Sequence, residues 1–287
     1  MTDMKKIDLH MHSTVSDGTD TPRELLDHVR EAGIALFALT DHDAVKGCKE
    51  IRGLLSEDDP KLVTGVEFSC RDGQGKYHIL GYRYDPDSAS ILDLVERGHR
   101  YRIGKVKTRL ALIRERFGFA FSEEDIRNLL ALDNPGKPHI ANLMVRYGYA
   151  PSKQTAIREY LNRLHFQSEY ISPEDAIRGI LAGGGIPVLA HPAFGSGEQM
   201  ITGSEMEQRL RRLTGYGLQG VEAFYSEYTP ELTAEALAFA EMFELVVTAG
   251  SDYHGRNKTI PLGKTNLDRE TSIPEGLKRF LRRIDEY

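Results

Sequence analysis

The chain has 287 residues, of which 40% are hydrophobic and 28% charged, a composition that supplies a sizeable core and excludes wholesale disorder. Its formal net charge of −6 argues against a general nucleic-acid coat. Because it has two cysteines, no signal peptide and no apolar run near the roughly 18 residues of a membrane helix, we expect a soluble cytoplasmic protein without disulfides, membrane contact or an obligate protein partner.

Short apolar, β-branched runs alternate along the chain with amphipathic helical patterns, which is typical of βα units. The expected strands are 5–11, 35–40, 61–68, 76–84, 186–190, 220–226 and 245–250. Helix starts between them are well marked, as in Thr21-Pro22-Arg23-Glu24, where a capping residue is followed by a proline and then a glutamate. Seven strands with helices between most of them predict an α/β protein with a closed or nearly closed barrel.

The alternation stops between residues 97 and 171. This stretch contains helical patterns at 98–117, 122–131, 139–147 and 152–163 and no convincing strand. It holds 14 Lys and Arg against 7 Asp and Glu, a net charge of +7, whereas the remainder of the chain sums to −13. We therefore predict a barrel formed by 1–96 and 172–287, and an inserted basic helical subdomain, the cap (97–171), which faces an anion.

Histidines and carboxylates stand where the expected strands end. The first strand delivers His10 and His12, whose side chains share one face because residues i and i+2 of a strand point the same way. The parallel strands of a barrel gather their carboxyl ends on one face, so residues that are distant in sequence converge there. The resulting candidate metal ligands are His10, His12, Asp17, His42, Glu67, His78, His191, Asp252 and His254.

Nine such ligands exceed the needs of one ion, which binds about four to six of them. Gathering imidazoles and carboxylates without a cation would leave repelling acids and poorly solvated rings. We therefore expect two or three divalent ions, with Glu67 or Asp252 able to bridge them. Nitrogen and oxygen ligands suit Mn, Fe or Zn, and their spacing does not choose among these metals.

The ordered motifs resemble those of the polymerase and histidinol phosphatase (PHP) family of metal-dependent phosphoesterases. The matching segments are Asp8-Leu9-His10-Met11-His12-Ser13, Thr40-Asp41-His42-Asp43, Ala190-His191-Pro192 and Ser251-Asp252-Tyr253-His254, with Gly65-Val66-Glu67 and Tyr77-His78 between them. The resemblance implies a distorted (β/α)7 barrel that holds a trinuclear site, commonly with manganese, iron or zinc. Within the family, the inserted segment of this chain resembles that of the small stand-alone bacterial members, which include a 3′,5′-bisphosphonucleotide phosphatase, an RNA 5′-exonuclease and a cyclic phosphodiesterase.

Four residues are candidates for contact with substrate. Gly136-Lys137-Pro138-His139 resembles the family segment that presents basic side chains to phosphate, so the resemblance implies this role for Lys137 and His139. Tyr225 and Ser251 lie near the expected catalytic face and are assigned to substrate from their position alone.

We expect hydrolysis of a small, nucleotide-like phosphomonoester by a hydroxide bridged between metals, with Asp252 assisting proton transfer. The alternative is a phosphodiesterase acting on short RNA 5′ ends or on small cyclic phosphates. A metal-dependent amidohydrolase and a non-enzymatic, metal-stabilised module rank below both. Asp41, beside His42, either orients a ligand imidazole or caps the helix that follows.

Overall fold

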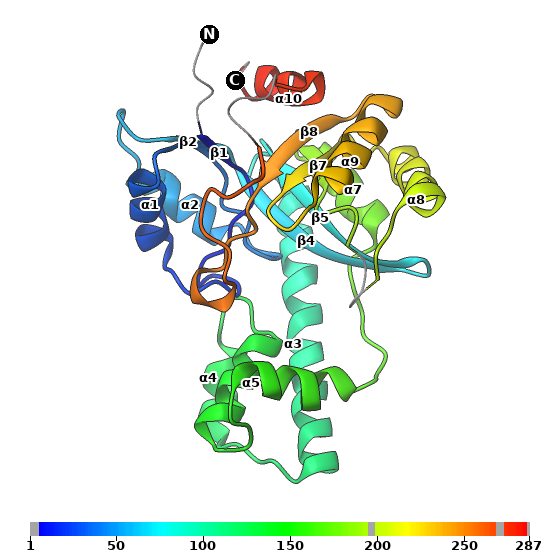
Figure 1. Cartoon of the computed structure of the whole chain (residues 1–287). Helices are drawn as coiled ribbons and strands as arrows, with labels where there is room; N and C mark the ends of the chain where they lie inside the picture. The colour runs from blue at the N-terminus through cyan, green and yellow to red at the C-terminus, as the bar shows by residue number, and fades with distance from the viewer. Residues whose placement is uncertain (1–5, 195–198, 268–272, 286–287) are drawn as a thin grey trace.

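The computed structural model describes residues 6–194, 199–267 and 273–285 (Figure 1). The strands are β1 (Lys6–Asp8), β2 (Ile34–Phe37), β3 (Lys61–Leu62), β4 (Gly65–Asp72), β5 (Gly75–Tyr82), β6 (Ile186–Leu189), β7 (Gly220–Tyr225) and β8 (Val246–Gly250). The helices are α1 (Pro22–Glu31), α2 (Lys46–Leu54), α3 (Ala89–Phe117), α4 (Glu123–Leu130), α5 (Lys137–Arg146), α6 (Lys153–Thr155), α7 (Pro173–Ala182), α8 (Gly203–Tyr216), α9 (Pro230–Met242) and α10 (Glu275–Asp285). A π-helical turn (Ala156–Tyr160) and two 3-10 turns (Leu161–Arg163 and Gly255–Asn257) complete the set. The first residue of the expected strand 5–11 lies outside the described residues.

The predicted α/β class is confirmed, but the strands of the described residues form two sheets and not a closed barrel. One sheet has the parallel order β1-β2-β3, and the other has the order β4-β5-β6-β7-β8. Isolated bridges join Met11, after β1, to Tyr253, after β8, and His42, after β2, to Glu67 within β4. The strand ends of both sheets therefore meet even though the ring of strand pairing is not continuous.

The prediction of an all-parallel arrangement fails around β5, which is antiparallel to both β4 and β6. The reason is local: only Gly73 and Gln74 connect β4 to β5, and a parallel connection needs a crossover of a dozen or more residues. The amide of Gln74 donates to the carboxylate of Asp72 at 2.8 Å and stabilises this turn. The expected strand 61–68 is also split into β3 and β4.

Helix starts follow the capping signals in the sequence. Thr21 accepts a hydrogen bond from the amide of Glu24 at 3.3 Å, and the Glu24 carboxylate accepts from the amide of Thr21 at 2.8 Å. The side chains of Ser172 and Thr229 also accept from a backbone amide at the starts of α7 and α9, each before a proline. These helices cover the outer faces of the sheets and hold their strands in place.

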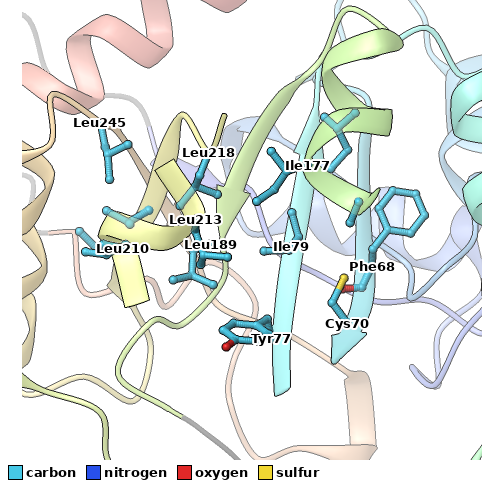
Figure 2. Packing of buried hydrophobic residues seen from close by; sticks show 14 of the residues in the cluster. Phe68, Cys70, Tyr77, Ile79, Ile177, Leu189, Leu210, Leu213, Leu218 and Leu245 are labelled. Atoms are coloured by element: carbon cyan, nitrogen blue, oxygen red, sulfur yellow. The ribbon is translucent and has the colours of Figure 1, made fainter. Parts of the chain in front are cut away.

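The largest buried cluster lies between the five-stranded sheet and its helices. Figure 2 shows Phe68, Ile79 and Leu189 on the strands packing with Ile177 of α7 and Leu213 of α8. These side chains are at most 1% exposed. Each buried side chain of this size contributes about 1.5–3 kcal/mol of hydrophobic free energy, so this core fixes the strand ends that carry the site.

The cap has a separate hydrophobic cluster, which includes Val106, Ile113, Ile140, Met144 and Leu161. Its helices α4, α5 and the helical turns at 153–163 match the expected helices closely. Helix α3 begins at Ala89, earlier than expected, and runs without a break from beside α7 into the lower part of the molecule (Figure 1). The division of the chain at residues 97 and 171 stays a prediction, since α3 crosses the first boundary uninterrupted.

Of the helices in the described ranges, none combines the length with the apolar character that crossing a membrane requires.

Candidate metal centre and its basic cavity

The fold brings all nine predicted ligands together. Strand β1 leads directly into His10 and His12, β4 and β5 carry Glu67 and His78 within their pairing, and the others follow β2, β6 and β8 or the loop at Asp17. We call these nine residues the candidate metal centre: His10, His12, Asp17, His42, Glu67, His78, His191, Asp252 and His254.

Glu67 lies in the middle of this centre and is 1% exposed. Its two carboxylate oxygens lie within 3.5 Å of a ring nitrogen of five histidines: His10, His12, His42, His78 and His191. The shortest of these distances, 2.9 Å, joins Oε1 to Nδ1 of His78. One carboxylate therefore lies beside the five candidate histidines that precede His254 in the chain. This arrangement suits a bridging ligand.

Two aspartates complete the arrangement on the side of His254. Oδ1 of Asp17 lies 3.2 Å from Nε2 of His254 and 3.8 Å from Nδ1 of His12. Oδ1 of Asp252 lies 3.4 Å from Nε2 of His12 and 3.5 Å from Nε2 of His10. Ligand atoms of three overlapping groups lie within 4.8 Å of one another: His12–Asp17–His42–His254, His10–His12–Glu67 and His42–Glu67–His78.

The donor set fits divalent metal ions. Six buried polar atoms of the centre make no hydrogen bond: Nε2 of His10, Nε2 of His12, Oδ1 of Asp17, Nδ1 of His42, and Oε1 and Oε2 of Glu67. Leaving a buried polar group unpaired costs about 1–3 kcal/mol, and more when the group is charged. Since these atoms converge on shared space, cations bound there would satisfy all of them at once.

The pKa values of the centre reflect crowding by opposite charges. Burial lowers the pKa of His12, but Asp252 and Glu67 outweigh it and raise the pKa to about 9. At His42 burial dominates and lowers the pKa to about 4. Burial raises the pKa of Glu67, yet His78 and His42 hold it well below its usual value. Because metal binds neutral imidazole, protons on rings such as His12 compete with the cation.

Glu222 of β7 is a functional residue that the sequence interpretation missed. Its carboxylate is fully buried; Oε1 lies 2.9 Å from Nδ1 of His10, and Oε2 accepts from the amide of His191 at 2.9 Å. It therefore fixes the ring of one candidate ligand and the backbone of another. An acidic residue inside the apolar run Gly220-Val221-Glu222-Ala223-Phe224 was the available signal.

Asp41 orients the centre and does not cap α2, whose N-cap is Val45. Its carboxylate accepts hydrogen bonds from the amide and hydroxyl of Ser13, both at 2.8 Å, and from the hydroxyl of Ser16 at 2.6 Å. The Ser16 hydroxyl lies 3.3 Å from Nδ1 of His12. Of the two roles expected for Asp41, the geometry matches the first, acting through a serine on the ring of His12.

Two of the residues assigned to substrate lie beneath the site. Ser251 is fully buried, and its hydroxyl donates to Asp8 at 2.6 Å, which ties β8 to β1. Tyr225 is 3% exposed and donates to Oδ2 of Asp252 at 2.9 Å. Lys258, from the loop after β8, also contacts Oδ2 of Asp252. Their positions near strand ends suggest substrate contact. In the structure, however, the Ser251 hydroxyl bonds to Asp8 between two strands, and the Tyr225 hydroxyl bonds to Asp252.

The two cap residues assigned to substrate differ from each other. Lys137 lines the cavity described below, and its Nζ donates to Asn162 at 2.7 Å. His139 does not line it; its Nδ1 accepts from the amide of Gly136 at 3.2 Å and caps the start of α5.

A cavity of about 250 Å³ opens between the centre and the cap. On one side it is lined by Asp17, His42 and His78 of the candidate metal centre. The rest of its lining contains five basic residues: Lys76, Arg102, Lys105, Arg109 and Lys137. Such a wall beside a cation site favours an anionic ligand that reaches both.

Comparison with known proteins supports the same chemistry. A family model described as PHP domain matches residues 8–171. A 5′-3′ exoribonuclease from Haemophilus influenzae is 30% identical over 283 residues, covering 96% of this chain and 99% of the relative. A 3′,5′-nucleoside bisphosphate phosphatase from Chromobacterium violaceum is 29% identical over 258 residues, 88% of each chain. The crystal structure of a presumed metal-dependent phosphoesterase from Bifidobacterium adolescentis superposes with a TM-score of 0.83 at 25% identity, covering 97% of this chain and 96% of that one.

Proposed function

The chain belongs to the PHP domain family, and from this membership and the geometry of the site we propose that it hydrolyses a small, nucleotide-like phosphomonoester. The broader class rests on its relatives: the chain is a metal-dependent phosphoesterase. The observation that carries the narrower proposal is the cavity of about 250 Å³ that candidate metal ligands and basic side chains line together. A pocket of this size suits a compact ligand better than a long strand.

We propose that the nine residues of the centre hold two or three ions, with Glu67 as the bridging carboxylate. Support comes from its contacts with five imidazoles and from its two unpaired oxygens. When bound, divalent cations such as Mn, Fe or Zn would neutralise charge on the ester and activate water. Glu222 and Asp41 would keep the rings of His10 and His12 turned toward the ions.

Asp252 would accept a proton during turnover. Its Oδ2 is occupied by Tyr225 and Lys258, while Oδ1 faces the rings of His10 and His12. Burial raises the pKa of Asp252, but Lys258 and His10 hold it well below its usual value. The low pKa keeps Asp252 ionised at neutral pH, so it has no proton to supply, and Oδ1 is its oxygen left free to accept one.

Lys137 would contact phosphate from the cap as a point charge. Burial, Arg109 and Lys76 lower its pKa to about 8, so an incoming anion would restore its full charge. His139 would act on the ester only indirectly, by holding the start of α5.

Phosphodiester hydrolysis is the second candidate, and the 30% identity to an exoribonuclease over nearly the whole chain favours it. The experiment is to purify the protein with its metals counted and to assay p-nitrophenyl phosphate, bis(p-nitrophenyl) phosphate, nucleoside bisphosphates, small cyclic phosphates and 5′-phosphorylated oligonucleotides. Orthophosphate release from monoesters alone supports the proposal. Cleavage of diesters alone would replace it by the second candidate, and inactivity at full metal content would reject both.

A further inference from the structure

The candidate ligand His42 lies in the loop that follows β2. Nδ1 of His42 is 3.0 Å from Oε2 of Glu67, and Nε2 is 4.0 Å from Oδ1 of Asp17. The next residue, Asp43, has a φ of 49°, in the left-handed region. A residue other than glycine is strained there and keeps this conformation only where its surroundings enforce it. The contacts that enforce it on Asp43 should therefore also set the position of His42.

The cap supplies one set of these contacts through α3. Asp43 is 4% exposed, and its Oδ2 accepts from Nε of Arg102 at 2.7 Å. Its Oδ1 accepts from the amide of Ser69 on β4 at 2.9 Å, and Nη2 of Arg102 donates to the Ser69 hydroxyl at 2.8 Å. Since removing one partner of a buried ion pair leaves the other charge uncompensated, this link ties α3 firmly to the loop.

Gly98 lets α3 come close enough for this link. It lies one helical turn before Arg102, so the two residues share a face of α3. A Cβ atom on Gly98 would lie 2.8 Å from Cβ and 3.0 Å from Cγ of Asp43, whereas carbon atoms pack at about 3.5–4.0 Å. Glycine stabilises a helix less than alanine does. The close contact with Asp43 accounts for the glycine at this position.

A second contact comes from the loop between α4 and α5. Asn134 is 4% exposed, and its Nδ2 donates to the carbonyl oxygen of His42. His99 of α3 donates from Nδ1 to the carbonyl oxygen of Asp133 at 2.8 Å, so α3 also supports this loop. The cap therefore holds the backbone of His42 as well as the side chain of the residue that follows it.

We propose that Gly98, Arg102 and Asn134, which we call the clamp, are positioning residues for His42, so that docking of the cap and binding of metal ions are coupled. His42 belongs to two of the three groups of ligand atoms that lie within 4.8 Å of one another, and the third group lacks it. The clamp should thus act on ions that use His42 and spare an ion at the third group. This rests on the metal centre of the proposed function and not on which ester is cleaved.

The test is a titration of the metal-free protein with Co²⁺ alone, followed by visible absorption and by competition with a chelator. In Gly98→Ala and in Asn134→Ala the affinity for at least one ion should fall about 10- to 100-fold, and the absorption of that ion should change, as expected when a metal ligand loses the contacts that orient it. Gly104→Ala is the matched control. Gly104 is an exposed glycine of the same helix, and a Cβ there would meet no atom from another part of the described chain within 4 Å, so this variant should bind Co²⁺ as the wild type does.

A purely structural role predicts a different result. If Gly98 and Asn134 serve packing alone, their variants have a lower melting temperature without metal but an unchanged Co²⁺ titration, which would overturn the clamp. Coupling between two sites is also reciprocal. Co²⁺ should therefore slow hydrogen exchange of the cap amides in the wild type, and this slowing should be reduced or lost in Gly98→Ala. Equal slowing in both proteins would contradict the coupling.

The outcomes distinguish this inference from the proposed function. Identical titrations of the wild type and both variants would overturn the clamp and leave the phosphoesterase intact. A wild type that binds Co²⁺ but hydrolyses no ester would contradict the proposed function, and the variant titrations would still decide on the clamp. A wild type that binds no Co²⁺ would overturn both.

Discussion

The candidate metal centre and the basic wall of the cap bound one cavity, yet they handle buried charge in opposite ways. In the centre, carboxylate oxygens and imidazole nitrogens from separate strands and loops lie as little as 2.9 to 3.2 Å apart, and the atoms left unpaired converge on common space. In the cap wall, Lys105 and Arg109 make no ion pair with a described residue, and the nearby carboxylate of Asp43 is paired with Arg102. The first arrangement fits bound cations, and the second favours an anionic ligand in the cavity.

Removing the carboxylate of Glu67 should have the largest effect of the predicted substitutions, and it tests whether the centre holds cations. Glu67→Gln removes the negative charge of the carboxylate that we propose bridges the ions and weakens its contacts with five imidazoles, so metal content should fall and turnover should drop by about 1000-fold or more. Metal analysis of the purified variant and phosphate-release kinetics check this. The exposed Glu57→Gln is the control, and a Glu67→Gln variant with full metal and normal turnover would contradict the bridging role.

How far the sequence predicts each region follows from how each is encoded. His10 and His12 were readable because strand alternation and the gathering of strand ends are local rules with a long-range consequence. The role of Glu222 is not predicted, because the sequence does not show which side chain a single acid in an apolar strand will contact. The positions of Lys105 and Arg109 in the cavity wall are not predicted, because a lysine and an arginine four residues apart are typical of a solvent-exposed helix face. The antiparallel β5 was missed because the barrel expectation overrode the short Gly73–Gln74 connection.

Substitution of Glu222, which contacts the candidate metal centre, should reduce activity less than substitution of Glu67. Glu222→Gln keeps the shape but removes the negative charge beside Nδ1 of His10, so metal affinity or turnover should fall roughly 10- to 100-fold. The measurement is metal affinity by competition with a chelator, together with kcat and KM. Since Glu222 does not touch the cavity, KM should change little; a KM effect without loss of metal affinity would contradict a positioning role.

The two regions should also respond to pH with opposite signs in the metal-free protein. His12 has a folded-state pKa of about 9, above the ordinary value near 6.5, so its stabilising contribution is complete below about pH 6.5 and is lost as pH rises through 9. Lys105 has a folded-state pKa of about 7, below its ordinary value near 10.5, so the unfolded state binds more protons between these values and stability rises with pH. Each single proton contributes at most about 1.4 kcal/mol per pH unit.

Chemical denaturation of the metal-free protein at pH 6.5, 7.5 and 8.5 separates these contributions. Relative to the wild type, His12→Gln should make the free energy of unfolding rise more with pH, and Lys105→Met should make it fall more. Variants whose slopes match the wild type would show that neither group titrates in this range.

The smallest predicted effect concerns how the cap is tied to the sheets. Arg102 of α3 reaches Asp43, which is 4% exposed, and also donates to Ser69 at 2.8 Å, so this link is buried beside the candidate ligand His42. Lys46 and Asp133 also join the two regions at 2.6 Å, but their side chains are 65% and 49% exposed. Lys46→Ala should therefore change the free energy of unfolding by less than about 1 kcal/mol and leave kcat and KM within error, because exposed ion pairs gain little over water. Denaturation and steady-state kinetics in low and high salt test this: a salt-dependent loss of turnover in Lys46→Ala would mean that the exposed pair, and not the buried one, sets how the cap wall faces the centre.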